Sequence, residues 1–143
     1  MLTISRRAQN TPASAIRKLA PFAEQAKSRG VSIYHLNIGQ PDLPTPQPIL
    51  DFIHHFKEKT LEYAPSLGLK EAVEAWQNFY SDKEVYFEKE EILVTSGGSE
   101  ALLFAFLSVC DPGEELLIFE PFYTSYASLA AMGNIVIKPV TTV

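Results

Sequence analysis

The stretch Ile92–Leu102 constrains this chain more than any other, because an apolar segment runs through two glycines directly into a helical pattern. The first turn of a helix exposes N–H groups without intrahelical partners and carries partial positive charge, so it binds phosphate through the backbone alone. Gly97 and Gly98 allow close approach to the backbone, and Ser99 adds a hydroxyl donor. The stretch predicts an anion site at the carboxyl edge of a sheet. The alternative is a tight strand-to-helix turn that binds nothing.

From Ile92 onward, short apolar segments alternate with helical patterns. Wholly apolar strands are typically covered on both faces, and a spacing of about 20 residues between them implies crossover helices. We therefore expect an α/β fold with a mostly parallel, helix-covered sheet. Three strands alone would leave exposed edges. The expected strands are 92–95, 116–119 and 135–140, and the expected helices are 100–109 and 122–132.

Three helical patterns precede this region. The first carries apolar residues from Ile16 to Ala26 on one face, with Pro21 expected to kink or divide it and Gly30 to end it. The second is expected from Pro46 to about Lys59 with Thr45 as its cap, and the third carries an apolar stripe from Leu69 to Tyr80 in which Trp76 is expected to be core.

Composition excludes several classes of partner. The 143 residues carry a net charge of −5 without a basic run, which argues against nucleic acid and anionic membranes as partners. No apolar segment reaches the roughly 18 residues of a membrane helix, and residues 1–7 do not resemble a signal peptide. The single cysteine, Cys110, follows an apolar run and is expected to be a buried structural thiol. One cysteine favours a reducing compartment, so we expect a cytoplasmic protein.

Other chemistries fit the sequence less well. Ser99 lies in a turn that resembles the nucleophile elbow, but all three histidines lie upstream of it, so a hydrolase triad in the usual order cannot be completed within this chain. The glycine patterns of dinucleotide sites and P-loops are absent. His54 and His55 are adjacent and point about 100° apart on a helix, so they are expected to be solvated rather than metal ligands.

Aromatic residues follow the second expected strand. Tyr123 lies in Glu-Pro-Phe-Tyr, which leaves that strand at the edge where the glycine turn also lies. A ring beside a phosphate site favours a flat cofactor, although such an aromatic is more often core. Tyr63 lies in a loop with proline and glycine, where its hydroxyl can reach a ligand or simply pack.

These motifs, in this order, resemble class I/II aminotransferases, which are pyridoxal-phosphate enzymes of fold type I. The resemblance is carried by N-I-G-Q-P-D-x-P-T-P, Y-x-x-x-x-G, V-T-S-G-G-S-E-A-L, D-P-G-E-E and E-P-F-Y. It implies that residues 1–45 form an N-terminal arm and substrate-side loop, and that 46–143 form the first part of the large domain that binds pyridoxal 5′-phosphate. The rest of that domain and a C-terminal small domain would follow Val143.

The resemblance also implies roles for individual residues. Gly97, Gly98 and Ser99 match the positions that hold the cofactor phosphate, and Tyr123 matches the aromatic that stacks on the pyridine ring. Tyr63 matches the residue that reaches the phosphate in the neighbouring subunit, which implies a homodimer. The substrate side is matched by Gly39, near the α-carboxylate, and by Ile16 in the arm.

The same resemblance implies transfer of an amino group between an amino acid and a 2-oxo acid. The family's cofactor-binding lysine is expected beyond Val143, because no lysine here has the family's serine-lysine context, so no catalytic residue is assigned and this polypeptide alone is not expected to transaminate. Two alternatives stay open. One is another fold type I enzyme, a lyase or a ring-closing synthase, and the other is a non-catalytic fragment that binds phosphate or dimerises.

Overall fold

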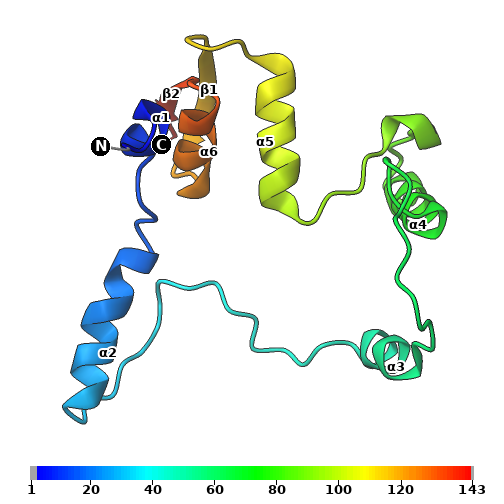
Figure 1. Cartoon of the computed structure of the whole chain (residues 1–143), viewed down its shortest axis with the longest axis horizontal. Helices are drawn as coiled ribbons and strands as arrows, with labels where there is room; N and C mark the ends of the chain where they lie inside the picture. Colours follow the sequence, from blue (N-terminus) through cyan, green and yellow to red (C-terminus); the bar gives the residue numbers. More distant parts are fainter. Residues whose placement is uncertain (1–2, 143) are drawn as a thin grey trace. The chain divides into compact units, whose positions relative to one another are not determined.

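The computed structural model describes residues 3–142, which form two compact units. The first unit combines residues up to His35 with the segment from Thr95 onward, and the second is Leu36–Val94. Figure 1 follows the chain through both. The first unit contains α1 (Arg6–Asn10), η1 (Arg17–Leu19), α2 (Ala20–Ser28), α5 (Gly98–Val109), β1 (Glu115–Glu120), α6 (Ser125–Met132) and β2 (Val136–Thr141), and the second contains α3 (Gln47–His55), α4 (Lys70–Ser81) and η2 (Lys89–Glu91).

The sheet of the first unit consists of β1 and β2, which pair in parallel with Leu116 opposite Ile137. Helix α6 is the crossover between them, as the apolar spacing predicts. Phe106 of α5 and three residues from α6 to the start of β2 form a buried cluster, on which Leu116, Ile118 and Ile137 pack. The core therefore lies between α5, α6 and one face of the sheet. The three further members of the cluster are Leu129, Ala130 and Ile135.

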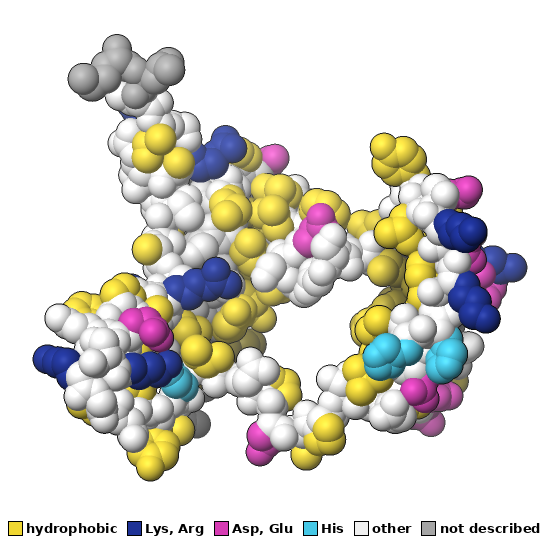
Figure 2. Space-filling model, turned by 60° about the horizontal axis from the view of Figure 1, so that its bottom comes forward, with side chains coloured by type: hydrophobic (Ala, Val, Ile, Leu, Met, Phe, Trp, Pro, Cys, Tyr) yellow, Lys and Arg dark blue, Asp and Glu magenta, His cyan; other side chains and the backbone are white. Residues whose placement is uncertain are grey.

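The other face of the sheet is uncovered within residues 3–142. Leu117 is 60% exposed and Phe119 is 64% exposed, although both alternate with residues that face the core. We expected helices on both faces of the sheet. Among the described residues, helices cover only the face that contacts the core. Figure 2 shows hydrophobic side chains over much of the visible surface.

The expected strand 92–95 is wrong as a paired strand. The segment is extended at Ile92, with φ −113° and ψ 121°, but no strand within the described residues pairs with it. Its main-chain contact is the Val94 N–H, which donates to the Leu67 carbonyl oxygen at 2.8 Å. An apolar run becomes a strand only where a neighbour supplies the ladder of hydrogen bonds, and such a neighbour is not visible in local sequence.

The N-terminal segment follows the predicted division at Pro21. Proline lies in the first turn of α2, where a missing N–H costs nothing, so η1 ends and α2 begins there. Gly30 follows the helix with φ +80°. The expected N-terminal arm also contains α1, which is capped by the Ser5 hydroxyl at 3.1 Å from the Ala8 nitrogen. Beyond α1, the Pro12 carbonyl accepts from the Ser128 hydroxyl of α6 at 3.2 Å.

Three expectations for the second unit are wrong. Thr45 does not cap α3, since Pro46 is the cap residue and makes no side-chain bond, and the helix ends at His55 instead of Lys59. Trp76 is 45% exposed and not core, because no element of this unit covers that face of α4. Its ring instead lies edge-on to Phe79, with centroids 5.5 Å apart.

None of the helices in residues 3–142 combines the length and apolarity needed to cross a bilayer. The same residues hold no cluster of three or more side chains suited to binding a metal ion.

Candidate functional site

The glycine turn places the start of α5 as the sequence predicts. Gly97 has φ 157° and ψ 172°, a combination that is essentially restricted to glycine, and the helix begins at Gly98. The Gly97 carbonyl then accepts from the N–H groups of Glu100 at 3.1 Å and Ala101 at 3.2 Å. The Gly97 carbonyl group therefore connects the turn to the first turn of the helix through these two hydrogen bonds.

Two side chains that sequence reasoning did not single out brace the turn. The Thr95 hydroxyl donates to the Gly97 carbonyl at 3.0 Å, and the Ser96 N–H donates to a Glu100 carboxylate oxygen at 2.7 Å. Glu100 is the third residue of the helix, where an acidic side chain commonly caps free N–H groups. The position of Glu100 in the first turn of the helix could have predicted its role from the sequence. The role of Thr95 could not be predicted, because it depends on the path of the backbone.

The backbone N–H groups of Gly97, Gly98 and Ser99 make no hydrogen bond within residues 3–142. The space around them is open, because a Cβ added to Gly97 or Gly98 would meet no atom within 4 Å. The positive end of the α5 dipole lies at the same place. Three free donors around an open turn suit the oxygens of a phosphate group, so these residues fit the phosphate site that the sequence predicts.

Tyr123 lies between β1 and α6 and is 57% exposed. Its ring is edge-on to Tyr126, with centroids 6.3 Å apart, and Tyr126 in turn lies 6.0 Å from Phe106 of α5. Helix α5 and β1 are joined by a short connection and run in opposite directions (Figure 1), so the start of α5 and the end of β1 lie at the same end of the unit. The structure therefore brings Tyr123 to the same end as the glycine turn, without a recorded contact between them.

The remaining predicted residues belong to both units and are described in each by itself. Ile16 belongs to the first unit, where it is half-buried at the start of η1. Gly39 and Tyr63 belong to the second unit, which is described by itself. Gly39 lies in exposed irregular backbone, and Tyr63 is completely exposed in a loop. The roles of these three residues stay predictions.

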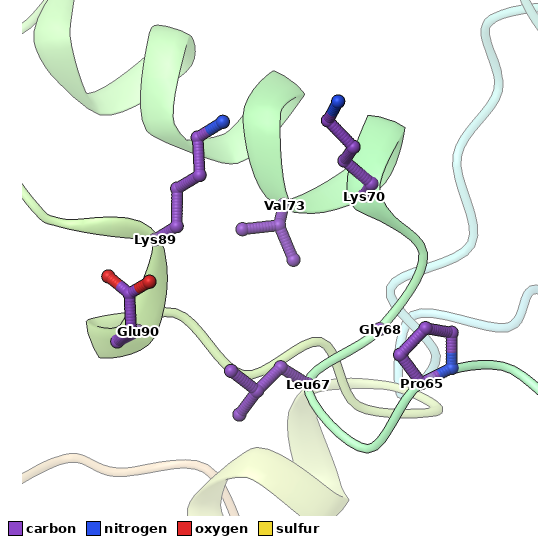
Figure 3. Close-up of a pocket in the computed structure, with 7 residues that line it drawn as sticks. All are labelled: Pro65, Leu67, Gly68, Lys70, Val73, Lys89 and Glu90. Atoms are coloured by element: carbon purple, nitrogen blue, oxygen red, sulfur yellow. The ribbon is translucent and has the colours of Figure 1, made fainter.

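A hollow of about 220 Å³ lies in the second unit, beside the N-terminal end of α4 (Figure 3). The side chains of Lys70 and Lys89, which line the hollow, point away from Leu67 on its opposite side (Figure 3). Lys89 forms an ion pair with Glu74, with an Nζ–Oε1 distance of 2.6 Å. The hydrogen bond from Lys89 holds the pKa of Glu74 below its usual range and raises the pKa of Lys89. The hollow is lined by Pro65, Leu67, Gly68, Lys70, Val73, Lys89 and Glu90.

The geometry gives no support to a hydrolase. Within residues 3–142 no histidine is hydrogen-bonded to Ser99, and the His55 ring nitrogen lies 2.7 Å from the Asp51 carbonyl oxygen of its own helix. Cys110 packs against the buried cluster of the first unit, but it is half-buried and not buried as expected.

Comparison with known proteins bears on the same residues. The family model for aminotransferase class I and II matches residues 31–143. The chain is 35% identical over 125 residues to the (5-formylfuran-3-yl)methyl phosphate transaminase of Methanocaldococcus jannaschii, covering 86% of this chain and 34% of that protein. It is 30% identical to the aspartate/prephenate aminotransferase of Thermus thermophilus, covering 99% of this chain and 37% of that protein.

Similarity to solved structures points to the same family. The alanine aminotransferase from Pyrococcus furiosus superimposes with a TM-score of 0.90 at 28% identity, over 99% of this chain and 37% of that chain. The chain thus spans about a third of the length of the curated relatives that it matches. Its fold is part of the fold type I architecture. On the matched motifs, the glycine turn and this superposition, the chain belongs to the class I and II aminotransferases.

Proposed function

We propose that this protein takes part in transferring an amino group between an amino acid and a 2-oxo acid, with pyridoxal 5′-phosphate as cofactor. The observation that carries the proposal is the set of three free N–H groups at Gly97, Gly98 and Ser99, at the open start of α5. Membership of the aminotransferase family supports the same conclusion. When bound, the cofactor supplies the electron-withdrawing ring on which amino groups are exchanged.

In this proposal the residues of the chain bind and orient the cofactor and the substrate. The N–H groups of the glycine turn and the Ser99 hydroxyl would hold the phosphate, which anchors the cofactor as a handle. The Tyr123 ring is exposed enough to pack against a flat ring. On the substrate side, Gly39 would offer its backbone to the α-carboxylate, and Ile16 would lie nearby.

We further propose a cytoplasmic homodimer. Tyr63 is completely exposed, so its hydroxyl is available to a phosphate bound in a second subunit. A lone cysteine is compatible with a reducing compartment. Activity would also require a lysine that binds the cofactor covalently, and we propose that it lies outside residues 1–143.

The test begins with the polypeptide of residues 1–143. It is expected to bind pyridoxal 5′-phosphate more tightly than pyridoxal, which lacks the phosphate, and to release no 2-oxo acid from an amino acid. Equal affinity for both ligands would contradict the phosphate site, and turnover would contradict the need for a further lysine.

A second experiment concerns the reaction class. Borohydride reduction of the full-length gene product with its cofactor is expected to label a lysine outside residues 1–143 and none of the eight lysines of this chain. Analysis of products from a panel of amino acids is expected to yield 2-oxo acids paired with new amino acids. Elimination or ring-closed products would instead indicate a related fold type I enzyme, and no labelled lysine would indicate a binding protein.

A further inference from the structure

We propose that Tyr126 is a positioning residue for the Tyr123 ring, which it holds at a fixed place relative to α5. This inference rests on the proposed function. The motif Glu-Pro-Phe-Tyr supplied a role for Tyr123, but none for the tyrosine three residues later. Both tyrosines and the glycine turn at the start of α5 belong to the first unit.

Tyr126 lies on the face of α6 that packs on the core. Leu129 and Ala130, three and four residues further along the helix, are 7% and 1% exposed. Residues at this spacing share one face of a helix. Tyr126 is itself half-buried and packs against the buried cluster. The core therefore anchors the Tyr126 ring.

Two separate contacts join Tyr126 to Tyr123. The Tyr126 N–H donates to the Tyr123 carbonyl oxygen at 3.0 Å. The two rings lie edge-on, with an interplanar angle of 85°, which is one of the favourable arrangements of aromatic pairs. Tyr123 nevertheless stays more than half exposed, so a flat ligand can still reach its ring. Tyr126 thus supports Tyr123 without covering it.

Tyr126 also contacts α5, the helix that begins at the glycine turn. Its ring lies edge-on to that of Phe106, with an interplanar angle of 76°, and Phe106 is part of the buried cluster. The Phe122 ring stacks on Tyr126 at 9°, with centroids 6.2 Å apart. Helices α5 and α6 pack against each other (Figure 1). Tyr126 therefore connects the Tyr123 ring to the helix that carries the glycine turn.

The chemistry of the cofactor makes this connection useful. A short covalent link joins its phosphate to its ring, so the residues that hold the two groups must keep a fixed separation. Without the Tyr126 ring, the exposed Tyr123 side chain would have to become ordered when the cofactor binds, and that ordering lowers affinity. We therefore expect Tyr126 to strengthen the binding of ligands that have the ring, and to leave the binding of phosphate alone unchanged.

The first test is ligand binding to the full-length gene product with Tyr126→Leu. The probe is pyridoxamine 5′-phosphate, whose amine forms no covalent bond with a lysine. Its dissociation constant is expected to rise about threefold, whereas that of inorganic phosphate should stay at the wild-type value. Tyr126→Phe keeps the ring and should bind both ligands as the wild type does. Unchanged binding of pyridoxamine 5′-phosphate in Tyr126→Leu would overturn the inference.

A double variant separates positioning from a merely structural role. In a protein that already carries Tyr123→Ala, the further change Tyr126→Leu should weaken binding no more, because no Tyr123 ring is left to position. The same threefold loss in both backgrounds would overturn the inference. Phe104→Leu is the matched control, since it removes from α5 a ring that is 43% exposed. It should leave both dissociation constants unchanged, and a loss equal to that of Tyr126→Leu would also overturn the inference.

A measurement without ligand distinguishes failure of this inference from failure of the proposed function. In the ligand-free full-length protein, the NMR order parameter of the Tyr123 ring is expected to fall in Tyr126→Leu, and an unchanged value would overturn the inference. Tyr126→Met, whose flexible side chain fills the same space, replaces Tyr126→Leu if the latter does not fold. If the wild type does not bind pyridoxamine 5′-phosphate, the proposed function fails, and the order parameter still decides whether Tyr126 positions Tyr123.

Discussion

At the scale of single residues, the glycine turn contains two glycines with different requirements. Gly97 has the φ and ψ that glycine alone adopts readily, whereas Gly98 is the first residue of α5. A Cβ added to either meets no atom within 4 Å. The two positions therefore differ in backbone conformation and not in available space.

This difference predicts the effect of alanine on stability. Gly97→Ala is expected to lower the free energy of unfolding by about 1–3 kcal/mol because of backbone strain. Gly98→Ala is expected to leave it unchanged or raise it by up to about 1 kcal/mol, because alanine favours the helix. Urea denaturation of both variants measures the difference, and equal destabilisation would contradict the assigned conformation of Gly97.

Tyr123 provides a second residue-scale prediction. If its ring packs on the cofactor, Tyr123→Phe keeps the affinity for pyridoxal 5′-phosphate, whereas Tyr123→Ala weakens it by about 0.5–1.5 kcal/mol, or several-fold. Fluorescence titration gives both dissociation constants. Tyr34→Ala is the control, since Tyr34 is 87% exposed and has no assigned role. Wild-type affinity in Tyr123→Ala would contradict ring packing.

At the scale of elements, Lys89 joins η2 to α4 through Glu74. The lowered pKa of Glu74 means that the folded state favours its ionised form. The pair should therefore stabilise the fold above the ordinary pKa of Glu74, 4.5, and lose that contribution as the pH falls through the lowered value. The raised pKa of Lys89 removes the contribution again only at strongly alkaline pH.

The prediction compares Glu74→Gln with Glu71→Gln on the same helix. Glu71 makes no ion pair within residues 3–142. Near pH 7 and low salt, Glu74→Gln is expected to be the less stable variant. The difference should decrease as the pH falls below the ordinary pKa of Glu74, and should shrink in high salt because both partners are solvated. Thermal unfolding at pH 7 and pH 3 measures it. A difference that is as large at pH 3 as at pH 7 would contradict the ion pair.

Only some of the helices and strands could be predicted from sequence patterns. Helix α4, the parallel pair β1 and β2 and the start of α5 could be predicted, because each depends on local periodicity or on a glycine. The unpaired segment at Ile92 and the exposed Trp76 could not be predicted, since both depend on which distant residues lie alongside. For the site, the three free N–H groups follow from the local pattern, whereas the brace from Thr95 does not.

At the scale of the whole molecule, the described residues leave apolar surface uncovered on the sheet and on α3, where Phe52 is 69% exposed. The relatives are about three times as long as this chain. The proposed dimer predicts that the full-length gene product sediments as a dimer. Tyr63→Phe should keep that mass but weaken pyridoxal 5′-phosphate binding about tenfold, because a hydrogen bond to a charged phosphate is lost. A monomer, or unchanged affinity, would contradict the role of Tyr63.

The central claim is that the turn before α5 holds the phosphate of the cofactor, and a crystal structure with bound pyridoxal 5′-phosphate tests it most directly. The predicted result is a phosphate within hydrogen-bond distance of the backbone nitrogens of Gly97, Gly98 and Ser99. A cofactor bound with its phosphate elsewhere, and these N–H groups facing only water, would contradict the account.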